Sequence, residues 1–184
     1  MNHDTDNAAQ VTCLIENGYI RSDRQLISSE KGIAEPFCIS DDKETGIDIR
    51  KLFERKPKLR WAGLITSPYA AAIANAGVPL RPMLDDMAQI FGMRISCLDP
   101  SEKKFESKAI SKLSGSLAVI IKGCGILTAA GSLYDFTAHA MVLEKSCRAR
   151  IESDVLGGGK VISPIEALLM RFIYVMKYSK KADA

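Results

Sequence analysis

The 184-residue sequence has little of what marks several common protein classes. It has two histidines, His3 and His139, so a metal site that needs three histidines cannot be built from one chain. Positive and negative charges nearly balance, and the net charge of +3 gives no electrostatic support to a nucleic-acid partner. The apolar runs fall short of the ~18–20 residues that a membrane-spanning helix needs, so we predict no membrane association.

The five cysteines are scattered along the chain, and none belongs to a C-x-x-C pair. An odd number of scattered thiols suits a reducing compartment better than a disulfide framework does. The first ten residues, MNHDTDNAAQ, are polar and lack the apolar core of a secretory signal. We therefore predict a cytoplasmic protein in which residues 1–10 form a disordered tail and residues 11–184 form a single domain.

Hydrophobic periodicity and turn residues predict an alternation of strands and helices. The predicted strands cover residues 18–29, 34–40, 59–66, 93–98, 117–123 and 126–129, and the predicted helices cover 47–56, 67–77, 82–92, 102–115, 132–151 and 163–181. Residues 41–46, DDKETG, are expected to form a turn because of their composition. Ser67 is the predicted N-cap of its helix because Pro68 follows it. The last helix has a wide apolar arc, which we expect to pack on the body or on a neighbouring subunit.

A glycine-flanked cysteine, Cys124, lies between two apolar strands in LAVIIKGCGILTAAGS, residues 117–132. Cys124 has three alternative interpretations. It is a nucleophile, a metal ligand, or a residue that replaces a metal ligand the protein no longer has. A nucleophilic cysteine needs a neighbouring base, cation or helix N-terminus. Lys122 is close in sequence, but alternation at a strand end does not establish that it faces the thiol.

The segments LITSPYAAAIANAGVPLRPMLDD (64–86) and AVIIKGCGILTAAGSLYDFTAHAMVLEKSCRARI (118–151) together resemble the class II aldolase/adducin family. That family has H-x-H-x-P before an alanine-rich helix, and later an apolar strand, H-G, a further glycine and a long helix with L-E. The resemblance covers roughly residues 45–175. It implies an α/β fold of three layers, α/β/α, with a central mixed, mainly antiparallel sheet, and a homo-oligomer, often a tetramer.

Members of this family hold a divalent metal, usually zinc, with three histidines, and an upstream glutamate acts as acid/base or as a further ligand. By the resemblance, the histidine positions fall on Leu64, Thr66 and Cys124, and the glutamate position falls on Thr45, beside Glu44. Leucine has no donor atom, and a neutral threonine hydroxyl is a poor zinc ligand. We therefore predict that the family's metal site is lost and that the protein has no metal and no cofactor.

Two functions of different class follow from this resemblance. The first is a pseudoenzyme that binds a small molecule or a partner, with Thr45, Thr66, Ser67 and Cys124 as the substrate-binding candidates. The second is an active lyase, epimerase or decarboxylase on a small sugar-phosphate-like or carboxylate substrate, with Glu44 or Cys124 as the catalytic candidate. A third alternative is an interaction module like the head of adducin.

Three further features each have a plain and a functional interpretation. His139 is either a packing residue of its helix or a residue that reaches the pocket of a neighbouring subunit. The KETG segment (43–46) is either a plain turn or a phosphate-binding turn. The GGGK segment (157–160) has no strand before it and no Ser or Thr after its lysine, so we interpret it as a flexible link and not as a P-loop.

Overall fold

The structure, a computed structural model, describes residues 3–29, 37–40 and 43–182, with side chains described over 7–29 and 46–177. A five-stranded sheet forms its centre. In spatial order the strands are β1 (Leu26–Ser28), β4 (Trp61–Ile65), β7 (Gly125–Ala130), β6 (Ala118–Ile121) and β5 (Cys97–Leu98). The β5–β6 pair is parallel and the other three pairs are antiparallel, as predicted for a mixed, mainly antiparallel sheet.

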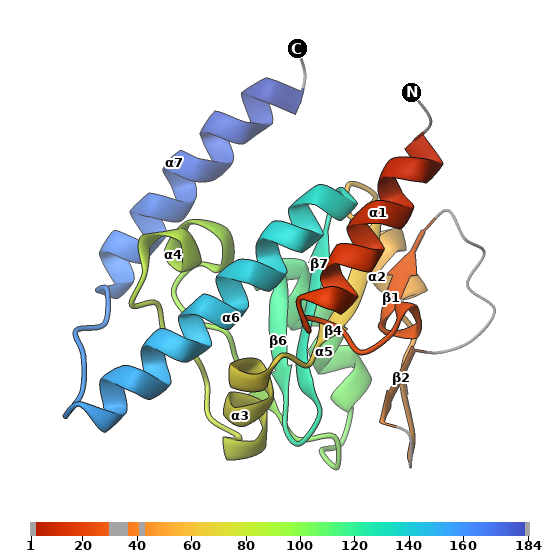
Figure 1. The fold of residues 1–184 in the computed structure, drawn as a ribbon. Helices are drawn as coiled ribbons and strands as arrows, with labels where there is room; N and C mark the ends of the chain where they lie inside the picture. The colour runs from red at the N-terminus through yellow and green to blue at the C-terminus, as the bar shows by residue number, and fades with distance from the viewer. Residues whose placement is uncertain (1–2, 30–36, 41–42, 183–184) are drawn as a thin grey trace.

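Helices lie on both sides of this sheet (Figure 1). One side carries α1 (His3–Glu16), α3 (Pro68–Ala76), α4 (Asp85–Phe91) and α6 (Leu133–Val155), and the other carries α2 (Arg50–Arg55) and α5 (Phe105–Ser116). A seventh helix, α7 (Pro164–Ala182), lies beside α4 and extends away from the sheet. The three-layer α/β/α arrangement is confirmed.

Two apolar clusters fill the spaces between the layers. The α5-side cluster consists of Ile47, Ile49, Leu52, Ala62, Leu64, Leu98, Phe105, Ala109, Ile110, Leu113, Val119, Ile121, Leu127 and Ala129. The α6-side cluster joins the opposite face of the sheet to residues of α1, α3, α4 and α6. Because side chains alternate along a strand, Leu64 belongs to the α5-side cluster and Ile65 to the α6-side cluster.

A separate two-stranded sheet pairs β2 (Phe37–Ser40) with β3 (Lys43–Ile47). Cys38 lies opposite Gly46, and Phe37 lies opposite Ile47. The predicted turn over residues 41–46 is therefore wrong for residues 43–46, which form a strand. Composition favours a turn there, but pairing with β2 gives the backbone groups of this polar segment their partners.

The N-terminal segment also differs from the prediction. A disordered tail is predicted over residues 1–10, but residues 3–10 belong to helix α1, His3–Glu16, and residues 1 and 2 lie outside the described residues. The apolar anchors of this helix, Val11 and Leu14, follow the polar segment and pack into the α6-side cluster, where Leu14 is fully buried. The burial of two apolar residues three positions apart therefore stabilises α1, although the first half of the helix has the polar composition of a disordered segment.

Most other elements lie within a few residues of the predictions. The strand expected over 18–29 is limited to the three residues of β1, after a 3-10 turn at Asp23–Gln25. The strand expected over 93–98 is limited to β5, with one further bridge between Leu80 and Ile95. Within the described ranges, none of the helices combines the length and apolar character needed to cross a membrane.

Candidate functional site

Three of the predicted site positions meet at one end of the sheet, where β4 ends and the β6–β7 turn begins. Ile65 pairs with Ile126, so the next residues, Thr66 and Gly125, also lie side by side. A Cβ added to Gly125 would lie 3.2 Å from both Leu64 Cγ and Thr66 Cγ2, and 2.5 Å from the carbonyl oxygen of Ile65. Only glycine fits this close approach, and it places Cys124 beside the end of β4.

Leu64 is an apolar core residue. Its exposed fraction is 2%, and its side chain belongs to the α5-side cluster. Cys124 is half-buried and packs against the same cluster. Leu64 and Cys124 therefore share an apolar environment.

Thr66 is tied to the segment that precedes β1. Its backbone N–H donates to the carbonyl oxygen of Tyr19 at 2.9 Å, and its hydroxyl donates to Gln25 Oε1 at 3.4 Å. The same Gln25 oxygen accepts a hydrogen bond from the backbone N–H of Arg21 at 2.5 Å. The Thr66 hydroxyl thus has a partner within the protein, at the long end of hydrogen-bond distances.

Ser67 faces α6, away from the α5-side cluster. Its exposed fraction is 1%, and its hydroxyl donates to Glu144 Oε2 at 2.5 Å. Glu144 also accepts hydrogen bonds from the backbone N–H groups of Tyr69 at 3.2 Å and Ala70 at 3.0 Å. Ser67 holds the N-cap position of α3, but its side chain makes no capping bond, and Glu144 satisfies the helix N-terminus instead.

The sequence does not predict this capping role, since a cap supplied from 75 residues away leaves no local pattern. The carboxylate of Glu144 also affects its surroundings. Burial and the negative charge of Glu144 raise the pKa of the Tyr19 hydroxyl. The Arg148 guanidinium lies over the ring of Tyr69, 5.8 Å from its centroid. The loop between β4 and α3 is thereby held from the α6 side.

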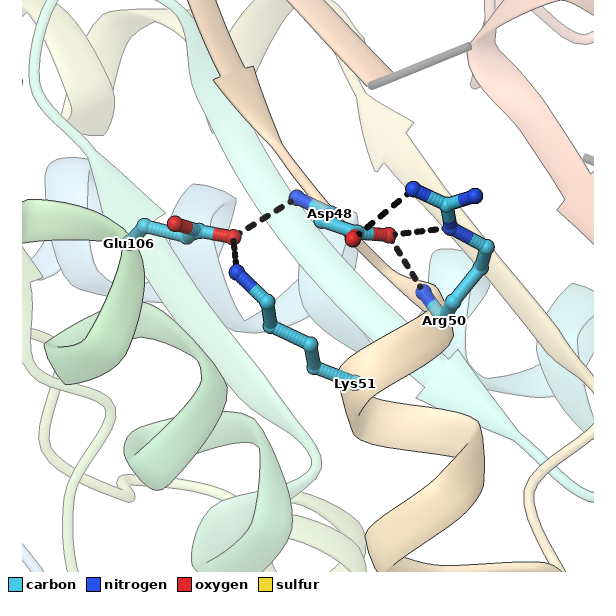
Figure 2. A network of polar contacts seen from close by, with 4 residues as sticks. All are labelled: Asp48, Arg50, Lys51 and Glu106. Atoms are coloured by element: carbon cyan, nitrogen blue, oxygen red, sulfur yellow. Dashed lines mark hydrogen bonds and ion pairs between the residues drawn. The ribbon is translucent and has the colours of Figure 1, made fainter. Parts of the chain in front are cut away.

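The end of β3 is held by a polar network around Asp48 and Glu106 (Figure 2). Glu106 Oε1 accepts a hydrogen bond from the backbone N–H of Asp48 at 3.2 Å and pairs with Lys51 Nζ at 2.7 Å. Arg50 pairs with Asp48 at 2.8 Å, and its hydrogen bond holds the pKa of that carboxyl below its usual value. These contacts attach the β3–α2 connection to α5.

Glu44 and Thr45 lie in β3, and their side chains fall outside the described ones. Ile47, at the end of the same strand, belongs to the α5-side cluster together with Leu64. The end of β3 therefore reaches the cluster that surrounds the end of β4. Where the Glu44 and Thr45 side chains point stays a prediction.

The turn between β6 and β7 is held by a backbone hydrogen bond and by an ion pair. Gly123 adopts a φ of +75°, which favours glycine, and its N–H donates to the carbonyl oxygen of Ala74 at 3.1 Å. Lys122 Nζ pairs with Asp99 at 3.1 Å. Within the described ranges, no three His, Cys, Asp or Glu side chains are grouped so that they could hold a metal ion.

His139 lies in the α6-side core, 15 residues after Cys124. Its exposed fraction is 7%; Nδ1 lies 3.5 Å from Thr128 Oγ1, and its ring meets Phe91 edge-on at 5.2 Å between centroids. Burial lowers the pKa of the imidazole to about 4, against the opposing effect of the Asp135 carboxylate. This placement favours the packing interpretation of His139.

Comparison with known proteins adds three findings. The family model described as Class II Aldolase and Adducin N-terminal domain matches residues 50–151, more than half of the chain. No curated protein matches the sequence.

Several solved structures share the fold. One titled L-fuculose 1-phosphate aldolase has a TM-score of 0.70 at 17% identity, covering 95% of this chain and 97% of its own. The crystal structure of YgbL, "a putative aldolase/epimerase/decarboxylase" from Escherichia coli, has a TM-score of 0.52 at 15% identity. The structure of L-fuculose 1-phosphate aldolase from Glaciozyma antarctica PI12 has a TM-score of 0.54 at 20% identity. They cover 65% and 67% of this chain, and 61% and 48% of their own.

Proposed function

The chain belongs to the class II aldolase and adducin family, and we propose that it is a member whose metal-dependent aldolase site has been lost. In this proposal the protein is a cytoplasmic pseudoenzyme that binds a small molecule and assembles as a homo-oligomer. The observation that carries the proposal is the burial of Leu64 in the α5-side cluster, at the first position where the family resemblance expects a metal-binding histidine.

The donor set around this position does not fit a catalytic zinc ion. Such a site takes three nitrogen, thiolate or carboxylate ligands from the protein and leaves one position open. Leu64 has no atom that can bind a metal ion. The Thr66 hydroxyl is a weak metal ligand, and it already donates a hydrogen bond to Gln25. Cys124 is the single strong donor among the three positions. We therefore assign no chemical step to a metal.

The proposed ligand is a small sugar-phosphate-like or carboxylate compound. Two structural neighbours are L-fuculose 1-phosphate aldolases, and this supports the class of ligand without identifying it. Thr66 and Cys124 would contact the ligand at the end of β4, and Thr45 would do so from β3. Ser67 is buried against Glu144, so its proposed contribution is to hold the adjoining loop.

Elemental analysis of protein purified without added metal or chelator tests the proposal. We expect zinc, iron and manganese to be far below one ion per chain. Stoichiometric content of any of these metals would overturn the metal-free proposal.

A variant with a rebuilt metal site tests whether Leu64, Thr66 and Cys124 occupy the family's histidine positions. Leu64→His, Thr66→His and Cys124→His together would supply three imidazoles where the family resemblance places them, and we expect this triple variant to bind zinc. The matched control carries Ile65→His in place of Leu64→His, because Ile65 faces the opposite side of the sheet. Equal zinc uptake by the two variants would contradict the correspondence.

Retained catalysis is the second candidate function. The half-buried Cys124 thiol in a glycine-flanked turn favours it. Incubation with ketose 1-phosphates would then release an aldehyde, and Cys124→Ser would abolish the release. We expect no release from the wild-type protein, and a turnover that Cys124→Ser removes would replace the pseudoenzyme proposal.

A further inference from the structure

Helix α7 is attached to the body along one side. Ala167 is fully buried, and Tyr174 packs against the α6-side cluster. Arg171 fastens the helix further, because its guanidinium donates to the carbonyl oxygens of Ile90 in α4 and Gly115 in α5. These contacts determine which face of α7 is turned toward the body. Figure 1 shows the helix itself beside α4, running away from the sheet.

The outward face of α7 is apolar. Seven large apolar side chains between 47% and 81% exposed lie along it: Ile165, Leu168, Leu169, Phe172, Ile173, Val175 and Met176. At ~100° per residue they form one continuous arc of about 160°, opposite Ala167 and Tyr174. We call this set the α7 apolar arc. It contains no charged residue.

The α7 apolar arc is as large as the largest apolar patches on monomeric proteins, which are often functional, and it would supply more than half of one side of a specific interface. Apolar side chains of this size present on the order of 100–150 Å² each when fully exposed, so the arc leaves roughly 400–600 Å² of apolar surface to water. The largest apolar patch of a typical monomer is about 300–600 Å². A specific complex buries about 800 Å² on each partner.

We propose that the α7 apolar arc packs against the α7 apolar arc of a second copy of this chain, with the two helices antiparallel. The proposal deepens the homo-oligomer part of the proposed function and rests on it. A charge-free apolar stripe is complementary to itself, as a two-fold interface requires. Its spacing, with apolar residues three and four positions apart from Ile165 to Met176, is that of helix-to-helix packing.

Charge complementarity specifies the direction of packing. Glu166 and Lys177 flank the arc on the same side, eleven residues or about three turns apart. One carboxylate oxygen of Glu166 accepts a hydrogen bond from the Ser163 backbone N–H at 3.1 Å, and the other oxygen is the one that would meet a second copy. In an antiparallel pair the same flanks of the two helices meet, so Glu166 of each copy faces Lys177 of the other. A parallel pair would instead place each charge beside the opposite flank. The midpoint of this pairing lies beside Phe172, which places the two Phe172 rings at the centre of the interface.

Sedimentation equilibrium of the full chain over a range of concentrations tests the interface. We expect the wild-type protein to self-associate and Phe172→Glu to weaken the α7-dependent step at least thirtyfold, as for a central aromatic residue. The matched control is Tyr134→Glu on α6, also an exposed aromatic but outside the arc, which should associate like the wild type. Circular dichroism establishes that each variant is folded.

A charge-swap series keeps the test informative if Phe172→Glu does not fold. Glu166→Lys and Lys177→Glu should each weaken association, and the double variant should restore it. A monomeric wild-type protein overturns both the interface and the homo-oligomer proposal. A wild-type oligomer that is unchanged by Phe172→Glu and by both single charge variants overturns the α7 interface alone.

Discussion

Gly125 shows how one residue can determine the geometry of the candidate site. The side chains of Leu64 and Thr66 both lie within 3.2 Å of the position that a Cβ would take on Gly125, and the carbonyl oxygen of Ile65 occupies the space that a side chain would need. The glycine is therefore required by the pairing of β4 with β7, whatever chemistry takes place beside it.

We expect Gly125→Ala to lower the free energy of unfolding by about 2 kcal/mol or more, because the added Cβ meets backbone that cannot move aside cheaply. Urea denaturation measures the change. The control is Gly115→Ala in α5, where an added Cβ meets no atom within 4 Å and improves helix propensity. A loss at Gly115 equal to that at Gly125 would contradict the steric explanation.

His139 makes stability depend on pH. The folded-state pKa of about 4 lies below the ordinary value of about 6.5, so protonation favours the unfolded chain. This contribution to stability is present above pH 6.5 and is lost as the pH falls through 4.

Between pH 7 and pH 4.5, we expect the free energy of unfolding of the wild-type protein to fall by on the order of 2–3 kcal/mol more than that of His139→Gln. Urea titrations of both proteins at pH 7, 5.5 and 4.5 give the difference directly, and the shared carboxylates cancel in it. Parallel pH profiles would show that His139 is not the source.

Helix α3 depends on a residue from α6 for its start. Glu144 accepts hydrogen bonds from the Ser67 hydroxyl and from the backbone N–H groups of Tyr69 and Ala70. The family resemblance includes this glutamate in the L-E pair of the long helix, but its role becomes visible only when α3 and α6 lie side by side.

We expect Glu144→Ala to destabilise the protein by about 2 kcal/mol or more, because it leaves several buried donors without an acceptor. Thermal or urea unfolding measures this. Glu152→Ala on the same helix is the control, because Glu152 pairs with Arg148 at the surface and should contribute less than ~1 kcal/mol. Equal effects of the two substitutions would contradict the capping role.

Local sequence patterns predict some elements of this fold better than others. Helices with clear starts and stops, such as α3 between Pro68 and Gly77, were predicted within a residue or two. Strand β3 and helix α1 were missed because their partners, not their own composition, stabilise them. The meeting of Leu64, Thr66 and Cys124 came from the family resemblance. The capping by Glu144 depends on distant contacts that no local pattern records.

For the molecule as a whole, Arg171 connects helices from the two sides of the sheet. It donates to a carbonyl group in the last turn of α4 and to another in the last turn of α5, where the helix dipoles favour a positive charge. Burial lowers the pKa of its guanidinium.

We expect Arg171→Met to loosen α7 and to accelerate limited proteolysis in the link over residues 156–163, with little change in proteolysis elsewhere. Mass spectrometry of the fragments locates the cuts. Arg150→Met is the control, since Arg150 pairs with Asp154 within α6. An unchanged cleavage rate in Arg171→Met would show that apolar packing alone holds α7.

The pairing of β4 with β7 has a consequence for the synthesis of the chain. Trp61 pairs with Ala130 and Ile65 with Ile126, so β4 leaves the ribosome about sixty residues before its central partner exists. At ~5–20 residues per second, this apolar strand waits several seconds without its neighbour. The β6–β7 hairpin, in contrast, can form as soon as it emerges. Aggregation of the nascent chain is therefore expected to start from β4, and a chaperone that binds there would protect the fold.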